Sequence, residues 1–288
     1  MHIVLLFVST LTALAEGTFI KKYNSKHSKG GFFFTGMVSL FSMLFFILTD
    51  TDGLTFSPDV IAYGIVAGIL YCTASLLTYI ALGCGSFAMS MLLLSYSGVF
   101  SIGYGLIFLG DKVGVFTYIG LALMLVSLFL FRGKSSPDSS AAVISPKWLV
   151  CISLSVVGSG MYNVIQKMQQ LRFNNSRTNE FMIIALSFSA IVLLLIGVFK
   201  DGKDAKYIIK HGGLWSIGAG LSNGATNMLS LIVNTMLPFT IVSPLRSGMK
   251  MLLSFILSIT LFKEKLLKRQ IIGVAIGTLA IILLNLKF

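Results

Sequence analysis

Two cations stand inside an apolar stretch of this sequence that is long enough to cross a bilayer. Residues 238–262 read PFTIVSPLRSGMKMLLSFILSITLF and carry Arg246 and Lys250 near their middle. A charge at the bilayer centre costs at least about 2.5–3.5 kcal/mol on insertion scales, so such residues usually face a partner or a water-filled cavity. At i,i+4 spacing the two side chains share one helix face. We therefore expect both to line a substrate-binding cavity. Pro244 precedes them and predicts a kink or an opened turn.

A stripe of polar residues in residues 212–236 could form another wall of that cavity. Asn223 and Asn227 lie one helical turn apart there, with Thr226, Ser230 and Asn234 on the same face. Side-chain amides both donate and accept hydrogen bonds, so they suit a polar solute. The alternative is that the stripe only joins helices, as polar residues in membranes often do. Further candidates for substrate binding are Tyr162 and Asn163 in residues 147–168, and Tyr79 in residues 59–82.

Glu16 is the acidic residue that lies clearly within an apolar segment. A carboxyl group that faces a cavity inside the membrane could exchange protons during transport. The alternative is an interfacial carboxylate that reaches Lys21 or Lys22, about one turn away. We carry both interpretations forward, with Glu16 as the candidate for proton coupling.

The composition excludes most classes of soluble protein. The 288 residues are 56% hydrophobic and 11% charged, and the mean hydropathy is +0.91. A soluble domain is nearer 25% charged, so we expect a multi-pass membrane protein. The net charge of +12 would suggest nucleic acid in a soluble protein. Here it falls in short loops, where membrane orientation and lipid contact explain it, so no nucleic-acid partner is expected.

The apolar segments predict an all-α protein with ten transmembrane helices. We expect them at residues 2–20, 31–49, 59–82, 86–109, 113–131, 147–168, 179–199, 212–236, 238–262 and 267–286. The first resembles a signal peptide, but no basic region precedes it and Lys21 and Lys22 follow it, so we interpret it as a retained helix. The expected location is the bacterial cytoplasmic membrane.

The sequence divides into two similar halves. Residues 132–146 are rich in Ser and Pro and predict a linker between repeats at 1–131 and 147–288. Residues 67–80 align without gaps on residues 219–232, and residues 109–131 align with one gap on 262–284. The first and sixth segments both end in lysine, at Lys22 and Lys167. Because each half has five spans, the halves would enter the membrane from opposite sides as inverted repeats.

The loop charges give an orientation for such a protein. Most Lys and Arg residues of the loops fall on one face, and the face with both termini carries Lys112, Lys167, Arg172, Arg177 and Lys287. Loops on the cytoplasmic side carry the excess of Lys and Arg, so this count places both termini outside.

No enzyme or metal motif is expected to act here. Residues 220–224 match G-x-S-x-G, but that motif needs a strand-to-helix turn and a nearby base, and here it lies within an apolar helical segment. Cys72, Cys84 and Cys151 are dispersed and predict neither a disulfide nor a metal site, and we expect no cofactor. Gly64/Gly68, Gly220/Gly224 and Gly273/Gly277 are spaced for close helix packing.

Two stretches carry a resemblance to a known superfamily. Gly110-Asp111-Lys112 with Ile119-Gly120, and Phe262-Lys263-Glu264-Lys265 with Gln270-Ile271-Ile272-Gly273, precede the last span of each half. This pattern resembles the drug/metabolite transporter superfamily in its ten-helix, EamA-like form. The resemblance implies alternating-access transport, and it implies cytoplasmic termini, against the charge count. The orientation therefore stays open.

A more local resemblance concerns the first segment. Leu14-Ala15-Glu16, followed by Gly17-Thr18 and Lys21, is similar to the first helix of the small multidrug resistance proteins. In those proteins the membrane glutamate exchanges protons against substrate, and the resemblance gives Glu16 that role. The sixth segment, however, has no acidic counterpart.

We therefore predict a secondary transporter of a small anionic or zwitterionic metabolite, either amino-acid-like or sugar-phosphate-like. The alternative within transport is a proton-coupled exporter of cationic drugs, which Arg246 and Lys250 would repel. A membrane enzyme would need a polar cluster at one interface, and a sensor or scaffold would need a soluble domain. Neither feature is visible. The expected partners are a small solute and the lipid bilayer, and we expect a monomer or a weak dimer.

Overall fold

The computed structural model of the chain describes residues 2–27, 30–51, 53–110, 114–131, 145–236, 239–263 and 268–285, and within these ranges it contains helices and no strand. The helices are α1 (His2–His27), α2 (Gly31–Thr49), α3 (Pro58–Cys84), α4 (Phe87–Ser95), α5 (Gly98–Phe108), α6 (Val115–Phe131), α7 (Pro146–Arg172), α8 (Thr178–Asp201), η1 (Gly202–Asp204), α9 (Ala205–Met236), α10 (Phe239–Thr260) and α11 (Lys268–Asn285). The predicted all-α class is confirmed for this part of the chain.

Helices form where the sequence predicts apolar segments, with two differences. The segment at 86–109 forms two helices, α4 and α5, which meet at Tyr96 and Ser97. Conversely, α10 continues through Pro244, so the alternative of an opened turn at this residue is wrong, while a kink there stays a prediction. Because Pro244 lies close to the start of α10, the hydrogen bond that it removes belongs to the first turns of the helix.

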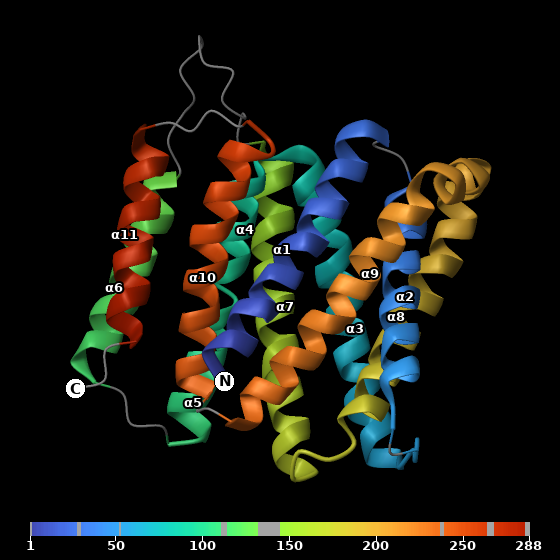
Figure 1. Cartoon of the computed structure of the whole chain (residues 1–288), viewed down its shortest axis with the longest axis horizontal. Coiled ribbons are helices and arrows are strands. Elements are labelled where there is room, and N and C mark those ends of the chain that lie inside the picture. Colours follow the sequence, from blue (N-terminus) through green and yellow to red (C-terminus); the bar gives the residue numbers. More distant parts are fainter. Residues whose placement is uncertain are drawn as a thin grey trace.

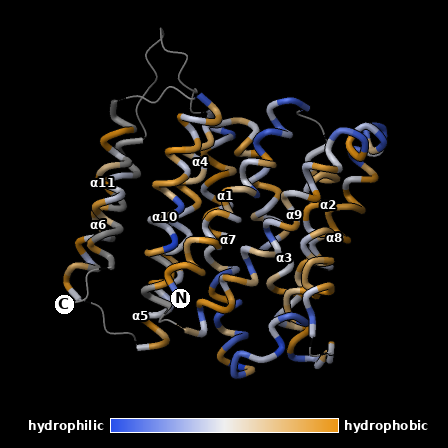
Figure 2. Tube along the Cα trace, viewed as in Figure 1, coloured by the Kyte–Doolittle hydropathy of each residue, from blue (hydrophilic) through white to orange (hydrophobic). Residues whose placement is uncertain are grey.

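Several helices are long and apolar enough to cross a membrane. Six stretches of the described residues meet that condition: His2–His27, Gly31–Thr49, Pro58–Cys84, Phe87–Phe108, Pro146–Arg172 and Thr178–Met236. The last of these contains both α8 and α9, which the short helix η1 joins. Figure 2 shows hydrophilic residues gathered at the upper and lower ends of the molecule, with apolar residues between them.

The helices pack in pairs that relate the first half of the chain to the second. α2 packs along α8, and α6 packs along α11 at the opposite edge of the bundle (Figure 1). α1 packs along α9, while α7 packs along α3. In the same way α9 covers α2 and α3 covers α8. In chain order α1 corresponds to α7, α2 to α8, α3 to α9 and α6 to α11. When corresponding helices are exchanged, each of these pairs becomes another of the pairs or itself.

Glycines permit the closest of these contacts, as their spacing predicts. A Cβ atom on Gly68 of α3 would stand 2.9 Å from the carbonyl oxygen of Ala185 on α8. A Cβ on Gly220 of α9 would stand 2.7 Å from the carbonyl oxygen of Val38 on α2. At both places a backbone lies where a side chain would otherwise be, which is the function of small residues in membrane helix packing.

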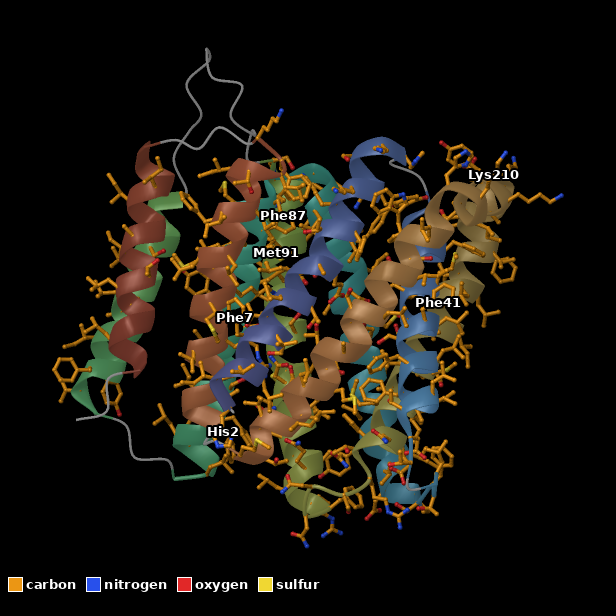
Figure 3. All side chains as sticks on the ribbon, in the orientation of Figure 1. His2, Phe7, Phe41, Phe87, Met91 and Lys210 are labelled. Carbon is orange, nitrogen blue, oxygen red and sulfur yellow. The ribbon has the colours of Figure 1, made fainter. Side chains whose placement is uncertain are left out.

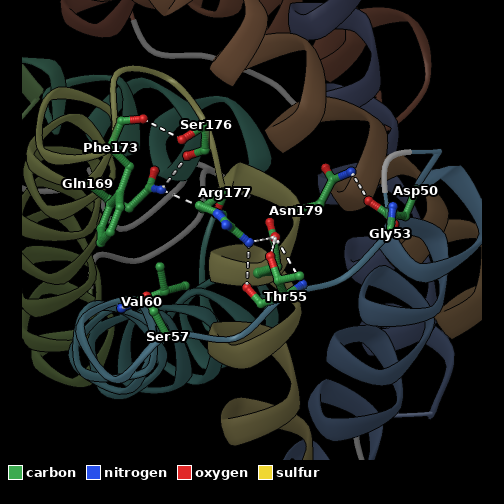
Figure 4. Close-up of polar contacts among 11 residues, drawn as sticks. Asp50, Gly53, Thr55, Ser57, Val60, Gln169, Phe173, Ser176, Arg177 and Asn179 are labelled. Carbon is green, nitrogen blue, oxygen red and sulfur yellow. Dashed lines mark hydrogen bonds and ion pairs between the residues drawn. The ribbon is translucent and has the colours of Figure 1, made fainter.

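The pair of α2 and α8 is joined at both ends by aspartates. Asp201 at the end of α8 accepts hydrogen bonds from the backbone N–H groups of Phe32 and Phe33, both at 3.1 Å. Asp50, just after α2, accepts a 2.7 Å bond from the side chain of Asn179 in the first turn of α8 (Figure 4). A carboxylate is favourable at a helix N-terminus because it faces the positive end of the helix dipole.

At the end of the molecule where α8 begins, hydrogen bonds hold the connection before α3 against the start of α8. Arg177 donates to the carbonyl of Thr55 at 3.0 Å and pairs with Glu180 at 3.3 Å, and Glu180 accepts from the Thr55 backbone N–H (Figure 4). Gln169 on α7 donates to the carbonyls of Ser176 and Arg177. These bonds fix the loops at the end where α7 finishes and α8 begins.

Some sequence predictions fall outside the described residues. These are the acidic signature residues Asp111 and Glu264, their neighbours Lys112 and Lys265, and residues 132–144 of the predicted linker.

Candidate functional site

A cavity of about 230 Å³, with charged, polar and apolar side chains in its wall, lies between α1, α2, α3, α4, α5, α7, α9 and α10. All eight residues that the sequence proposes for binding or coupling line it: Glu16, Tyr79, Tyr162, Asn163, Asn223, Asn227, Arg246 and Lys250. They come from five helices and are far apart in the sequence, so the fold brings together what the separate segments only suggest.

Arg246 presents two unused hydrogen-bond donors to this cavity. Its Nε and Nη2 atoms are buried, and neither has a partner among the residues that the structure describes. These two atoms form one edge of the planar guanidinium group, the edge that binds a carboxylate or phosphate through two parallel hydrogen bonds. A buried charged donor without a partner is costly, so this edge is suited to an acceptor that the protein itself does not supply.

Lys250 lies one turn further along α10 and contributes a second positive charge. It interacts electrostatically with Glu16 on α1 and with Arg246. Within the described part of the chain, however, no carboxylate lies within 4 Å of either cation as an ion pair. The positive charge in the cavity is thus only partly balanced by Glu16.

Asn223 is the centre of a hydrogen-bond network that includes Glu16. Its amide nitrogen donates to Glu16 Oε1 at 3.0 Å. Its Oδ1 atom accepts from the hydroxyls of Ser42 at 2.8 Å and Tyr71 at 3.0 Å, and from the amide of Asn227 at 3.0 Å. The bond to Asn223 on α9 therefore holds the Glu16 side chain in the cavity, and Glu16 does not reach back to Lys21. This position favours the interpretation of Glu16 as a candidate for proton coupling over that of an interfacial carboxylate.

The network continues from α9 to α7. Asn227 Oδ1 accepts from Tyr162 and from Gln166, each at 3.4 Å. The rings of Tyr71 and Tyr162 lie 5.5 Å apart, so α3 and α7 also meet at this point. A change at Glu16 is consequently connected through Asn223 and Asn227 to the helix on the other side of the cavity.

Tyr79 and Asn163 occupy other parts of the cavity wall. Tyr79 is buried near Phe34, with 5.5 Å between the ring centroids, and its backbone carbonyl accepts from Asn24 at 2.8 Å. Asn163 lies on α7 next to Tyr162 and is only partly buried. Both line the cavity.

The sequence did not single out Ser42, Ser247 or Ser95. Ser42 supports Asn223 from α2, and Ser247 on α10 donates to the carbonyl of Ser95 on α4 at 2.7 Å. Single serines in apolar segments carry little signal. For Ser42 the one available signal is its spacing from Ser39, which bonds Ser189 of α8 at 3.0 Å on the same helix face.

One end of the cavity is closed by dense packing. Lys21 donates to the backbone carbonyls of Leu82, at 2.9 Å, and Gly85, where α3 ends. Trp148 of α7 donates to Ser90 of α4 at 2.9 Å. A Cβ on Gly17 would collide with Met91 and lie close to Phe87, two residues of α4 that Figure 3 labels between α10 and α1.

The cavity wall carries two cations, one carboxyl group and several amides and hydroxyls. In the described residues there is no group of three or more His, Cys, Asp and Glu side chains that could hold a metal ion. The G-x-S-x-G sequence lies within α9, where the backbone is helical throughout and no strand-to-helix turn is present.

An all-helical bundle with a cavity of this kind among its apolar helices has the architecture of a membrane transport protein. Residues 146–286 match the model of the EamA-like transporter family, and this match supports membership of the chain in the drug/metabolite transporter superfamily. It is therefore a multi-pass integral membrane protein of the transporter type, in a family of transporters rather than enzymes.

The fold is also found among solved structures. One that is described as "Crystal structure of protein" superposes with a TM-score of 0.62 over 98% of each chain, at 14% sequence identity. At that identity the likeness concerns the fold alone. A search of the curated proteins finds no match.

Proposed function

We propose that the protein is a secondary active transporter of a small anionic or zwitterionic metabolite in the bacterial cytoplasmic membrane. The observation that carries this proposal is the unpartnered guanidinium edge of Arg246 in the central cavity. Arg246 would bind a carboxylate or a phosphate through Nε and Nη2, and Lys250 would add a point charge. Asn223 and Asn227, with Tyr162, Asn163 and Tyr79, would surround the rest of the solute.

Alternating access would come from two inverted halves of five spans each, α1–α6, in which α4 and α5 together form one span, and α7–α11. Three packing relations support this arrangement, because each survives exchange of the halves: α1 on α9 with α7 on α3, α9 on α2 with α3 on α8, and the self-related pair α2 and α8. The repeat alignment adds a fourth. It places Leu82 opposite Asn234, and these residues supply the carbonyls that Lys21 and Lys167 bind. Lys21, rather than the predicted Lys22, is thus the counterpart of Lys167.

Glu16 would couple the transport of an anion to protons. A bound anion and an ionised Glu16 compete for the same two cations, so the anion favours a proton on Glu16. The two would then cross the membrane together. The hydrogen bond from Asn223 holds Glu16 in the cavity in either state.

The alternative is export of cationic drugs through the same cavity, which the position of Glu16 also allows. Arg246 and Lys250 distinguish the two functions, because they attract an anion and repel a lipophilic cation.

The test begins with purified protein and a panel of amino acids, sugar phosphates, nucleotides and cationic drugs. A solute that binds the folded state raises its melting temperature. We expect stabilisation by an anionic or zwitterionic member of the panel. Arg246→Gln should then weaken its binding by at least about tenfold, since truncating one side of a buried charge pair costs 2–5 kcal/mol or more. The matched control is Arg172→Gln, an exposed arginine near the end of α7.

The same solute should be taken up by proteoliposomes that contain the wild-type protein, and not by those with Arg246→Gln. Stabilisation by cationic drugs alone, or full binding by Arg246→Gln, would remove the proposed function.

A further inference from the structure

The end of the cavity opposite Lys21 is closed differently. At the Lys21 end, α1 and α3 pack closely through their backbones. The related helices α7 and α9 show little backbone packing in the described residues, and long side chains bridge them instead. Lys167 donates to the carbonyl of Asn234 at 3.1 Å, and Gln170 donates to the carbonyl of Leu231 at 2.9 Å. We refer to this contact between Lys167, Gln170, Leu231 and Asn234 as the α7–α9 seam.

A second pocket lies on the outer side of the seam. It has a volume of about 190 Å³ and sits where α7 ends, α8 begins and α9 ends, at the lower edge of the molecule in Figure 1. Polar and apolar residues line it together: Phe46, Gln170, Asn175, Thr178, Asn179, Met228, Leu231, Ile232 and Thr235. The central cavity reaches the seam from the inside, since Gln166 and Asn234 line that cavity.

Each side of the seam carries a buried acceptor without a donor. Gln170 Oε1 and Asn234 Oδ1 have no hydrogen-bond partner among the described residues, although both side chains are at least nine-tenths buried. A buried polar atom that lacks a partner costs about 1–3 kcal/mol. Gln170 lines the outer pocket and Asn234 lines the cavity, so a donor group could be bound on either side.

From these observations we propose that the α7–α9 seam is the gate between the cavity and the face with the α7–α8 loop, and that the outer pocket is its vestibule. Lys167 selects for solutes with an anionic group, while the two amide oxygens bind ammonium or hydroxyl donors of the same solute. Opening this gate breaks the hydrogen bonds of Lys167 and Gln170 across the seam, and in the described residues it separates little backbone packing between α7 and α9. The identity of the natural solute rests on the proposed transport function, but the route and its charge preference do not.

The route can be tested with thiol reagents, which require no knowledge of the solute. Cys72, Cys84 and Cys151 are replaced by serine or alanine, and Ser230→Cys then places one reporter in the cavity wall. Sealed vesicles of both orientations receive 2-sulfonatoethyl methanethiosulfonate or 2-(trimethylammonium)ethyl methanethiosulfonate. These probes are similar in size and opposite in charge, and each rate is divided by the rate with a free small thiol.

We expect labelling from the face with the α7–α8 loop and slow labelling from the opposite face. Lys167→Met should lower the ratio of anionic to cationic labelling by about tenfold, the effect of one unit charge at short range in a partly solvated passage. Lys167→Arg, which retains the charge, should preserve the ratio. Gln170→Ala should accelerate both reagents equally, because it loosens the seam without changing its charge, and Leu171→Ala on the exposed side of α7 should change neither.

Labelling only from the face where Lys21 lies, or a ratio that Lys167→Met leaves unchanged while the protein elutes as a folded species, would overturn the inference. Failure of the proposed function has a different signature. In that case the labelling pattern holds, but no anionic or zwitterionic solute is bound or transported.

Discussion

Residue identity and spacing predicted which side chains line the cavity, while the contacts between them could be read only from the structure. Arg246 and Lys250 are conspicuous because charge is costly inside a membrane, and Asn223 and Asn227 because two amides on one face exceed what an apolar helix needs. All line the cavity. The partner of Asn223 on α1 was not predictable, because nothing in either segment specifies that α1 packs on α9.

At Glu16 the decisive comparison is with an isosteric residue that cannot ionise. Glu16→Gln removes the charge and retains a group that can still bond Asn223. If Glu16 carries the proton, we expect solute binding to persist, while an imposed pH gradient no longer drives accumulation in proteoliposomes. Counterflow, which needs no proton gradient, should continue.

The matched control for this variant is Glu180→Gln, because Glu180 is also buried but pairs with Arg177 at the end of the molecule. That variant should retain the response to the pH gradient. Gradient-driven uptake by Glu16→Gln at the wild-type level would assign proton coupling to another group.

At the scale of the helices, hydrophobic periodicity and length were sufficient to place the elements, and residues 31–49 were predicted to the residue. The interruption between α4 and α5 was not predicted, since Tyr96 and Ser97 resemble their neighbours in hydropathy. The continuation of α10 through Pro244 shows the converse error for the predicted opened turn, because the local propensity of one residue does not decide whether a packed helix opens there.

Glycine spacing predicted close packing, and this gives a matched test within α9. Gly220→Ala places a methyl group 2.5 Å from Cβ of Phe41 and 2.7 Å from the carbonyl oxygen of Val38. Overpacking of this kind costs roughly 1–3 kcal/mol. We expect a lower melting temperature in detergent for this variant.

The control is Gly213→Ala in the same helix, where no atom lies within 4 Å of the added methyl group. Alanine has the higher helix propensity by up to about 1 kcal/mol, so Gly213→Ala should leave the melting temperature unchanged or raise it. Equal destabilisation by both variants would mean that the α2–α9 contact does not depend on glycine.

At the scale of the whole molecule, the order of the helices and the internal similarity of the chain suggested two halves, but the sequence could not supply their relation in space. The reciprocal pairs provide it, with α1 on α9 matched by α7 on α3. The alignment of residues 67–80 on 219–232 gains a physical meaning here. When the alignment is extended by two residues it pairs Leu82 with Asn234, and the carbonyl groups of these residues accept the hydrogen bonds from Lys21 and Lys167. The halves nevertheless differ at those ends, because α1 packs on α3 while side chains bridge α7 and α9, and the proposed gate is at the second of these ends.

The last question at this scale is which end faces the cytoplasm. His2 and Lys210 lie at opposite ends of the bundle, and both are exposed (Figure 3). Near Lys210 the end of α8, the short helix η1 and the start of α9 also carry Lys200, Lys203 and Lys206, respectively. Each lysine near an anionic leaflet contributes about 1 kcal/mol, which favours a cytoplasmic location for this end. The family resemblance instead places the termini, and therefore His2, in the cytoplasm.

A membrane-impermeant maleimide applied to intact cells decides between these orientations. In the background without native cysteines, we expect His2→Cys and Lys210→Cys to be labelled in opposite conditions, one in intact cells and the other only after lysis. Labelling of Lys210→Cys only after lysis would establish the orientation that the charges favour, and the reverse pattern would establish the family's. Labelling of both in intact cells would contradict the bundle itself as a membrane-spanning unit, because α1 and α9 could not then each cross the bilayer between these two ends.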